Sequence, residues 1–312
     1  MFIEFQDHIN LKFPFLKKGK KLLVAISGGI DSVVLTHLLH RLNFDFQLAH
    51  CNFCLRGKES DQDEQFVIDM AKKLQLKIHT KSFDTQSYAQ TNNVSVQMAA
   101  RQMRYTWFKE LLQQEMLDYL ITAHNLDDNL ETFLINFTRG TGLEGLSGIE
   151  EINENIVRPL LGFSREQIEQ FANENKITWR EDSSNIDTKY TRNKIRHQVI
   201  PLLKEINPGL LQSFKRTSKH LQQSKHIITD TISDLKPKII TSDNEGVYKI
   251  DIGKMNKFSN PRAYLYELLK DYNFTEWNDV HNLLEGQPGK QIKSSTHRLI
   301  KDRDFLLLEL LS

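Results

Sequence analysis

The residues best suited to chemistry are six consecutive positions with the sequence SGGIDS: Ser27, Gly28, Gly29, Ile30, Asp31 and Ser32. They follow an apolar run, Leu22 to Ile26, and precede a helical pattern from Val33 to Leu42. Adjacent glycines let a backbone approach an anion closely, and the N–H groups and dipole at a helix N-terminus attract one. The order strand, glycine turn, helix therefore predicts a phosphate site, to which the two serines add hydroxyl donors.

Asp31 is the unusual member of this segment, because a carboxylate beside a bound phosphate repels it unless a cation lies between them. We therefore expect a divalent cation, Mg²⁺, at Asp31. The chain has no G-x-x-x-x-G-K-[ST] sequence, which argues against a kinase or GTPase of the common kind. The simpler alternative is a serine-capped turn that binds no ligand.

A second polar segment, TAHNLDDNLET, begins at Thr122 after another apolar run. His124, Asp128 and Glu131 stand at positions i, i+4 and i+7, a spacing that predicts one face of a helix. Two neighbouring carboxylates hold an ammonium group and repel a phosphate, so we predict an amine pocket. Mg²⁺ is the rival ligand, and a transition-metal site is a weaker rival. A capped helix with solvated acids is the alternative without a ligand.

Strand and helix patterns alternate along the first part of the chain. Strands are predicted at Leu22 to Ile26, Phe46 to His50, Leu76 to His79 and Tyr119 to Ala123, and helices at 33–42, 60–74, 96–116 and 126–138. This alternation predicts an α/β fold with a parallel sheet covered by helices on both faces. Ligands of such sheets bind at the carboxyl ends of the strands, so the polar segments that begin at Ser27, His50 and His124 should converge.

A second domain is predicted after the sequence Asn-Pro-Gly at 207–209. The helical stretch from Leu210 to about Leu235 would bridge to it, and we place the boundary near Phe214, between domains 1–213 and 214–312. The second domain is expected to be a smaller helical and α+β module, with patterned segments at Val247 to Ile252, Pro261 to Tyr272 and Gln291 to Leu308.

Composition limits the class of protein. The chain has 312 residues, of which 39% are hydrophobic and 26% charged, and its formal net charge is +1. These values are typical of a globular protein with a sizeable core. The N-terminal sequence does not resemble a signal peptide and no apolar stretch approaches about 18 residues, so we expect a cytoplasmic protein with no membrane partner. The two cysteines, Cys51 and Cys54, exclude a disulfide framework of the secreted kind.

Cationic residues are concentrated in one block, which is suited to contact with phosphates. Its members are Lys189, Arg192, Lys194, Arg196, Lys204, Lys215, Arg216 and Lys219. Arg101 and Arg104 share one side of a predicted helix, where either could neutralise a carboxylate or a phosphate. A solvated surface is the alternative for the block, and surface ion pairs are the alternative for the two arginines.

From Arg139 the sequence reads RGTGLEG, which contains the pattern G-x-G-x-x-G. A dinucleotide fingerprint must follow a strand, whereas this pattern follows a predicted helix. We therefore interpret it as a flexible glycine-rich loop near the active site.

Taken together, these motifs resemble the tRNA(Ile)-lysidine synthase branch of the PP-loop ATP pyrophosphatase superfamily. The resemblance covers nearly all of residues 21–210 and is carried by SGGIDS at 27, HCNFCLRGKESDQDEQFV at 50, ARQMRY at 100, TAHNLDDNLET at 122, RGTGLEGLSGI at 139, RPLL at 158, DSSNIDTKYTRNKIR at 182 and PLLKEINP at 201. A weaker similarity, GKQIKSSTHRLIKDRDFLLL at 289, continues into the family's first C-terminal domain. Two positions depart from the family, which often has histidine where this chain has Phe53 and Asn125.

The resemblance implies a fold and an activity. The fold would be of the adenine nucleotide alpha hydrolase type, followed by a tRNA-binding accessory domain at 214–312, and the family's last C-terminal domain is expected to be absent. The family joins the side-chain amine of L-lysine to C2 of the wobble cytidine of tRNA(Ile). It consumes ATP, passes through an adenylated cytidine, and releases AMP and pyrophosphate. The implied partners are therefore tRNA(Ile), L-lysine and ATP, and a homodimer is a further candidate assembly.

The resemblance also implies roles for residues. Ser27 to Ser32 would bind ATP, Asp31 would hold Mg²⁺, and Asp31 and Arg192 would be catalytic. Residues implied around lysine are Arg104, His124, Asp128 and Glu131, and those implied at phosphates of ATP or tRNA are Arg192, Lys194 and Arg196. The sequence leaves open which base takes the proton of the lysine amine: His124 could accept it, whereas the two carboxylates favour the charged amine.

Other functions are compatible with parts of the pattern. Cys51 and Cys54 form a C-x-x-C, and some PP-loop enzymes thiolate tRNA through cysteines, although two cysteines cannot complete a four-thiolate cluster. A non-catalytic ATP-binding protein of the same fold is an alternative of another class. An enzyme that amidates a small acyl substrate would also release pyrophosphate, without requiring tRNA.

Overall fold

The computed structural model describes residues 1–17, 19–181, 191–242 and 246–311. The chain divides into two compact units, Met1–Leu221 and Gln222–Ser312. This division and the boundary predicted near Phe214 both fall within one helix, α11 (Leu210–Ile239). The side chain of Phe214 is buried against residues of the first unit.

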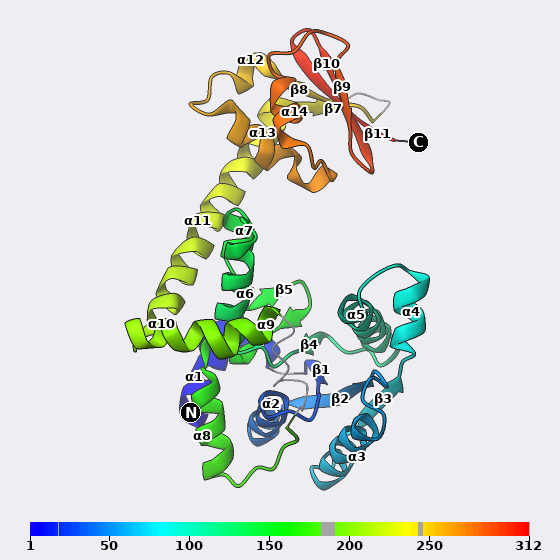
Figure 1. The fold of residues 1–312 in the computed structure, drawn as a ribbon, viewed down its shortest axis with the longest axis vertical. Helices are drawn as coiled ribbons and strands as arrows, with labels where there is room; N and C mark the ends of the chain where they lie inside the picture. The colour runs from blue at the N-terminus through cyan, green and yellow to red at the C-terminus, as the bar shows by residue number, and fades with distance from the viewer. Residues whose placement is uncertain (18, 182–190, 243–245, 312) are drawn as a thin grey trace. The chain divides into compact units, whose positions relative to one another are not determined.

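The first unit is built on a six-stranded sheet in the order β3-β2-β1-β4-β6-β5 (Figure 1). Its strands are β1 (Lys21–Ala25), β2 (Asp45–Asn52), β3 (Ile78–Ser82), β4 (Tyr119–Ile121), β5 (Ile152–Asn153) and β6 (Ile156–Val157). The first four strands and β6 pair in parallel, and β5 runs antiparallel to β6 at the edge. The prediction of a parallel sheet is confirmed, and the short strands β5 and β6 are additional to it.

Helices cover both faces of this sheet, because its central strands are apolar on both sides. In β1 the side chains of Leu22 and Val24 enter one buried cluster, with residues of α1, α2, α3 and α8, whereas Leu23 enters another, with residues of α5. The helices and helical turns of the unit are α1 (Phe2–Lys12), η1 (Pro14–Leu16), α2 (Ile30–Arg41), α3 (Lys58–Lys73), α4 (Thr85–Thr91), α5 (Val96–Gln114), α6 (Leu126–Thr138), α7 (Leu143–Leu146), η2 (Pro159–Gly162), α8 (Arg165–Glu174), α9 (Thr191–Lys194), η4 (Ile195–Val199) and α10 (Ile200–Ile206).

A third buried cluster joins α6 to the segments that carry the basic block. Leu126 and Leu130 of α6 pack with Ile195, Ile200 and Phe214. The segment η4 is a π-helical turn that ends two residues before Pro201, whose ring nitrogen cannot donate a hydrogen bond of a regular helix. This packing holds the cationic side chains of α9 and η4 above α6.

The glycine-rich segment does follow a helix, as predicted. Helix α6 ends at Thr138, and Gly140 has φ of +69°, a left-handed conformation that glycine adopts without strain. The next residues form the short helix α7, so the prediction of a flexible loop is wrong for Leu143–Leu146. The side-chain amide of Asn136 donates to the carbonyl oxygen of Gly145 at 2.8 Å and ties this turn to α6.

The second unit contains a five-stranded antiparallel sheet in the order β7-β8-β11-β10-β9. The stretch Gln291 to Leu308, predicted as strand-like, forms three strands that turn back on one another. The elements are β7 (Ile240–Ser242), β8 (Tyr248–Asp251), α12 (Ile252–Met255), α13 (Pro261–Leu269), η5 (Lys270–Tyr272), α14 (Trp277–Asn282), β9 (Gln291–Lys293), β10 (His297–Asp302) and β11 (Phe305–Leu310). They enclose their own apolar core.

Across the described ranges, every helix is too short or too polar to cross a lipid bilayer.

Candidate active site

The structure brings together the polar segments that follow β1, β2 and β4. The side-chain amide of Asn125, after β4, donates to Oδ1 of Asp31, after β1, at 3.0 Å. Nδ1 of the buried His50, near the end of β2, lies 2.9 Å from the carbonyl oxygen of Ile26. The predicted convergence at the carboxyl ends of the strands is therefore confirmed.

Residues Ser27–Ser32, here called the pyrophosphate loop, form a compact turn at the start of α2. Gly28 has φ of +93°, and Gly29 is the N-cap of α2 and has no side chain with which to cap the helix. The hydroxyl of Ser32 donates to the carbonyl oxygen of Gly29 at 2.9 Å and lies 3.2 Å from the hydroxyl of Ser27. The turn thus places backbone N–H groups and the exposed Ser27 at a helix N-terminus, the arrangement that binds phosphate, while the buried Ser32 donates its hydroxyl hydrogen within the turn.

Asp31, in the first turn of α2, is held between two donors. Nη1 of Arg165 lies 2.5 Å from Oδ2 of Asp31, and Asn125 donates to Oδ1. Burial raises the pKa of Asp31, the charge of Arg165 lowers it, and the nearby carboxylate of Asp128 raises it again. Since burial outweighs the single arginine, a further cation beside this carboxyl would stabilise its charged form.

His124 does not lie on the helix with Asp128 and Glu131, so that prediction is wrong. Helix α6 begins at Leu126 because Asn125 caps it. Oδ1 of Asn125 accepts from the backbone N–H of Asp128 at 2.9 Å, and Oδ2 of Asp128 accepts from the backbone N–H of Asn125 at 3.1 Å. This capping box ends the extended segment after β4. Nδ1 of His124 instead lies 3.0 Å from the hydroxyl of Thr122.

Asp128 and Glu131 do share one face of α6, where they meet two arginines. Nε of Arg196 lies 2.5 Å from Oε1 of Glu131, and Nη2 of Arg196 lies 3.3 Å from Oδ1 of Asp128. Nε of Arg192 lies 3.4 Å from Oε2 of Glu131, and its Nη2 donates to the hydroxyl of Thr132 at 2.8 Å. We call Asp128, Glu131, Arg192 and Arg196 the carboxylate–arginine cluster. In this structure the two carboxylates bind the guanidinium groups of Arg192 and Arg196, in keeping with an affinity for cations.

Burial dominates the electrostatics of this region. Glu131 is only 1% exposed, and burial raises its pKa while the hydrogen bond and charge of Arg196 lower it. Burial lowers the pKa of His124 to about 4, against the opposing charge of Asp128, so its imidazole is neutral at pH 7. Arg101 contributes to that lowering, which places Arg101, a neighbour of the predicted Arg104, within electrostatic range of His124.

Arg104 contacts Phe53, the residue that follows β2. Its guanidinium stands 5.1 Å from the centre of the Phe53 ring, and that ring stacks on Phe83 with centroids 5.6 Å apart. An arginine over an aromatic face gains a cation–π attraction. Phe53 therefore contacts an arginine of α5 through its ring face.

Three arginines of the region were missed by the sequence interpretation: Arg158, Arg165 and Arg180. Arg158 directly follows β6 and donates to the carbonyl oxygen of Glu150 at 2.7 Å. Arg165 is the first residue of α8, where a cation opposes the helix dipole. A positive charge at a helix N-terminus is unfavourable unless an acidic residue pairs with it, so this position was a sequence signal for a partner such as Asp31. Arg158 follows a two-residue strand whose pattern is too short to recognise.

The remaining cations of the basic block have separate contacts. Lys194 is exposed on α9, Nζ of Lys204 lies 3.9 Å from Oδ1 of Asp127, and Nζ of Lys215 donates to the carbonyl oxygen of Gly162 at 2.8 Å. Lys189 falls outside the described residues.

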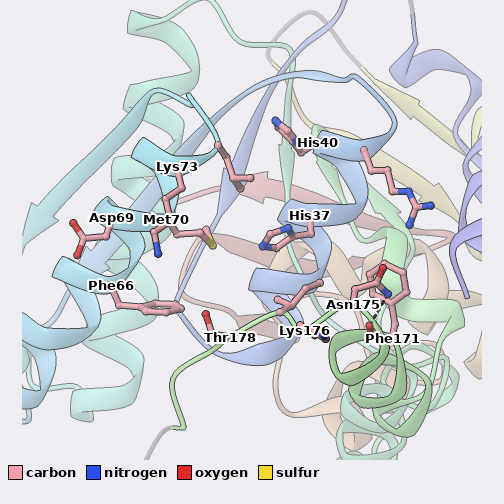
Figure 2. A pocket seen from close by; sticks show the side chains of 13 residues that line it. His37, His40, Phe66, Asp69, Met70, Lys73, Phe171, Asn175, Lys176 and Thr178 are labelled. Carbon is pink, nitrogen blue, oxygen red and sulfur yellow. Dashed lines mark hydrogen bonds between the residues drawn. The ribbon is translucent and has the colours of Figure 1, made fainter.

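A pocket of about 450 Å³ lies among α2, α3 and the segment that follows α8 (Figure 2). His37, Lys73 and Lys176 are among its polar walls, and Phe66 and Phe171 among its apolar ones. None of the residues predicted for the active site lines it. The assignment of the site therefore rests on the geometry of the pyrophosphate loop and not on this cavity.

Comparison with known proteins gives a consistent result. A family model described as a PP-loop domain matches residues 3–203, and one described as the TilS substrate binding domain matches residues 243–311. The tRNA(Ile)-lysidine synthases of Parabacteroides distasonis and Bacteroides thetaiotaomicron are each 42% identical to this chain, over 95% and 93% of its length. The chain belongs to the tRNA(Ile)-lysidine synthase family. It spans 67% of the length of each of these two lysidine synthases.

A solved structure shares the fold over much of this chain. The U34-tRNA thiolase NcsA from Methanococcus maripaludis, solved with its [4Fe-4S] cluster, aligns with a TM-score of 0.58 and 19% identity, over 71% of this chain and 79% of that one. At this identity the likeness concerns the fold alone. The PP-loop match makes the first unit an ATP-binding domain.

Proposed function

We propose that this chain joins the side-chain amine of L-lysine to C2 of the wobble cytidine in the CAU anticodon of tRNA(Ile), with ATP as the energy source. Its class, a tRNA-modifying ligase of the lysidine synthase type, follows from its family. The observation that carries the finer proposal is the hydrogen bond from Asn125 to Asp31. It joins the start of α6, which carries the carboxylates of Asp128 and Glu131, to the pyrophosphate loop. Anion and ammonium sites side by side are what an enzyme needs to join an amine to an adenylated base.

The pyrophosphate loop would bind the β- and γ-phosphates of ATP through its N–H groups and the hydroxyls of Ser27 and Ser32. Asp31 fits a role at Mg²⁺, because its carboxyl is buried, only partly compensated by Arg165, and close to a second carboxylate on Asp128. Magnesium is commonly held by one or two carboxylates together with substrate phosphates. When bound, it would neutralise charge on the departing pyrophosphate.

Lysine would bind at Asp128 and Glu131. In this structure the two carboxylates hold the guanidinium of Arg196, a planar cation in the place proposed for the substrate's ammonium. Both arginines lie on segments next to α6. We propose that they bind phosphates of ATP or tRNA when these are present, and that Asp128 and Glu131 are then free to bind lysine. Lys194, exposed on α9, would add a contact to the RNA backbone.

The proposed chemistry has two balanced steps. O2 of the cytidine attacks the α-phosphorus of ATP, an O–P bond forms, and pyrophosphate leaves with the electron pair of the broken P–O bond. The lysine ammonium loses one proton to give the amine, which attacks C2. A C–N bond forms, the C2–O2 bond breaks, AMP leaves with O2 and the electron pair of that bond, and a second proton is lost from nitrogen. His124, neutral because burial lowers its pKa to about 4, adds no positive charge to the pocket that would oppose the ammonium.

A thiolation reaction is less well supported. Burial raises the pKa of the Cys51 thiol to about 12, so it is protonated and a weak nucleophile at neutral pH. Cys54 is exposed, and no group of three or more cysteine, histidine or acidic side chains within the described ranges is arranged to hold a metal. The two relatives at 42% identity are tRNA(Ile)-lysidine synthases.

The experiment is an incorporation assay. The protein is incubated with ATP, Mg²⁺, unmodified tRNA(Ile) transcript and one radiolabelled amino acid at a time, and label in the RNA is counted. We expect label from lysine alone, and none with a transcript whose wobble cytidine is replaced by uridine. ATP binding without lysine incorporation would indicate a non-catalytic protein, and pyrophosphate release without tRNA would indicate an amidating enzyme.

Use of ATP and tRNA together would place the enzyme in the cytoplasm. A homodimer is the assembly we propose to test first, by light scattering during size-exclusion chromatography with and without tRNA.

A further inference from the structure

The peptide between Gly28 and Gly29 is held from outside the pyrophosphate loop. The carbonyl oxygen of Gly28 accepts a hydrogen bond from the backbone N–H of Arg180 at 3.0 Å. In a trans peptide the N–H points opposite to the C=O, so this bond turns the N–H of Gly29 away from Arg180 and into the loop. There it lies 3.3 Å from the hydroxyl oxygen of Ser27.

Among the described residues, the one other hydrogen bond of this peptide is the longer one that the N–H of Gly29 donates to the Ser27 hydroxyl oxygen at 3.3 Å. Gly28 has φ of +93°, and a glycine rotates through such conformations at low cost. If the plane turned over, the N–H of Gly29 would leave the anion site and the carbonyl dipole of Gly28 would enter it. The hydrogen bond from Arg180 therefore decides which end of the peptide dipole a phosphate meets.

The side chain of Arg180 anchors that backbone donor. Its Nε donates to Oδ1 of Asp63 at 2.8 Å, and its Nη2 donates to Oε1 of Gln62 at 3.1 Å. The other oxygen of Asp63 accepts from Nη2 of Arg56 at 2.7 Å. Asp63 is 7% exposed, so it is a buried carboxylate bridging two guanidinium groups, a strong and directional arrangement.

The helix that carries Asp63 is tied to the sheet. Asn52, the last residue of β2, donates from Nδ2 to Oε2 of Glu64 at 2.8 Å and to Oδ1 of Asp61 at 3.2 Å, and so ties the N-terminal half of α3 to the carboxyl edge. The same helix packs on the loop: a Cβ placed on Gly28 would lie 3.5 Å from Val67 and 3.6 Å from Phe66. A rigid chain of contacts thus runs from β2 through α3 and Asp63 to the pyrophosphate loop.

We propose that Asp63 is a positioning residue of the ATP site, which acts through Arg180 to aim the N–H of Gly29 at the terminal phosphates. The inference rests on the proposed binding of ATP at this loop. Asp63 touches neither the nucleotide nor the reacting atoms. It should influence recognition of the pyrophosphate portion of ATP and have no influence on recognition of adenosine.

The test compares ATP with AMP as ligands of the full chain, by calorimetric titration. Asp63→Asn and Arg180→Ala should each weaken ATP binding about tenfold and leave AMP binding unchanged. The double variant should be no weaker than the single ones, because both substitutions break one link. Asp69→Asn is the matched control, because Asp69 lies on the exposed side of the same helix and accepts only from Gln65 among the hydrogen bonds described.

The outcomes separate the two proposals. Equal losses of ATP and AMP binding would reveal a general structural role for Asp63 and overturn the inference, as would ATP binding unchanged in both variants. Failure of the wild-type chain to bind ATP would instead remove the proposed function on which the inference stands. Arg180 is 38% exposed at its side chain, so the Arg180→Ala variant keeps the test decisive if Asp63→Asn does not fold.

Discussion

The pyrophosphate loop is made of six neighbouring residues, whereas the carboxylate–arginine cluster joins Glu131 and Arg196, which are 65 positions apart in the chain. The loop uses backbone groups and short hydroxyls whose places follow from one turn between a strand and a helix. The cluster uses long side chains whose partners are set by the packing of α9 and η4 on α6. A loop of the first kind is ready for its ligand, but a cluster of the second kind must exchange an internal cation for a substrate.

The largest effect is expected at Asp31, the loop residue whose carboxyl interacts electrostatically with Asp128 of the cluster. Asp31→Asn should lower the rate of pyrophosphate release by about 100-fold or more, because it removes the only charge that Asp31 offers to a cation while keeping its size. Release would be measured with a coupled phosphate assay, and circular dichroism would verify the fold. Wild-type-like turnover in a folded variant would remove Asp31 from the mechanism.

A second prediction concerns the cluster alone. Asp128→Asn should raise the KM for lysine by about 10- to 100-fold, since a hydrogen bond to a charged group contributes about 1.5 to 3 kcal/mol. The KM for tRNA should be unchanged, because a carboxylate does not anchor RNA phosphates. The amide still offers an oxygen to the backbone N–H of Asn125, so the start of α6 should survive.

Asp127→Asn is the control for this variant. Asp127 is adjacent in sequence but accepts from the backbone N–H of Arg165 at 2.8 Å, outside the cluster. If the Asp128→Asn variant lost affinity for ATP and Mg²⁺ while lysine binding was unchanged, the cluster would be a metal site, and the proposal that it binds lysine would be wrong.

The third prediction uses pH to probe the border of the cluster. The pKa of His124 is about 4 in the folded chain, below the ordinary value of 6.5. Between these two values the unfolded chain binds a proton that the folded chain does not, so stability falls as the pH falls. Lowering the pH from 7 to 5 should reduce the free energy of unfolding of the wild type by about 2 kcal/mol more than that of the His124→Gln variant. Urea unfolding at both pH values measures the difference, and parallel losses in the two proteins would contradict it.

Features that depend on local sequence could be predicted, whereas contacts between distant residues could not. The loop and the limits of α6 were predictable because each depends on residues close together in the sequence. The parallel sheet was predictable because strand and helix patterns alternate along the chain. The error at His124 came from counting i, i+4, i+7 through a helix start, although the sequence Asn125 to Asp128 already carried the spacing of a capping box. The contact of Arg165 with Asp31 spans 134 positions, and no local pattern specifies its partner.

A smaller effect is expected from the exposed arginine of the cluster. Arg192→Ala should weaken tRNA binding about fivefold and reduce the salt dependence of binding by about one phosphate contact. Filter binding at several salt concentrations gives both numbers. Lys109→Ala, which removes an exposed cation from α5, is the matched control and should change neither. An unchanged salt slope for Arg192→Ala would restrict this arginine to its contacts within the chain.

The smallest effect is expected at the cysteines. Cys51→Ser combined with Cys54→Ser should keep lysine incorporation within about threefold of the wild type per folded molecule, because the Cys51 thiol is protonated at neutral pH. The measurement is the incorporation assay after chromatographic isolation of folded protein. Complete loss of activity in a folded double variant would revive thiolation.

The amide of Asn125 limits which residues can replace it. Its oxygen accepts from the first turn of α6 and its nitrogen donates to Asp31, so one short side chain must present an acceptor and a donor in opposite directions. Aspartate, with two acceptors at neutral pH, can meet only the first requirement. A neutral histidine, with one ring nitrogen protonated and the other not, meets both. Asparagine and neutral histidine are thus two solutions to one bonding requirement.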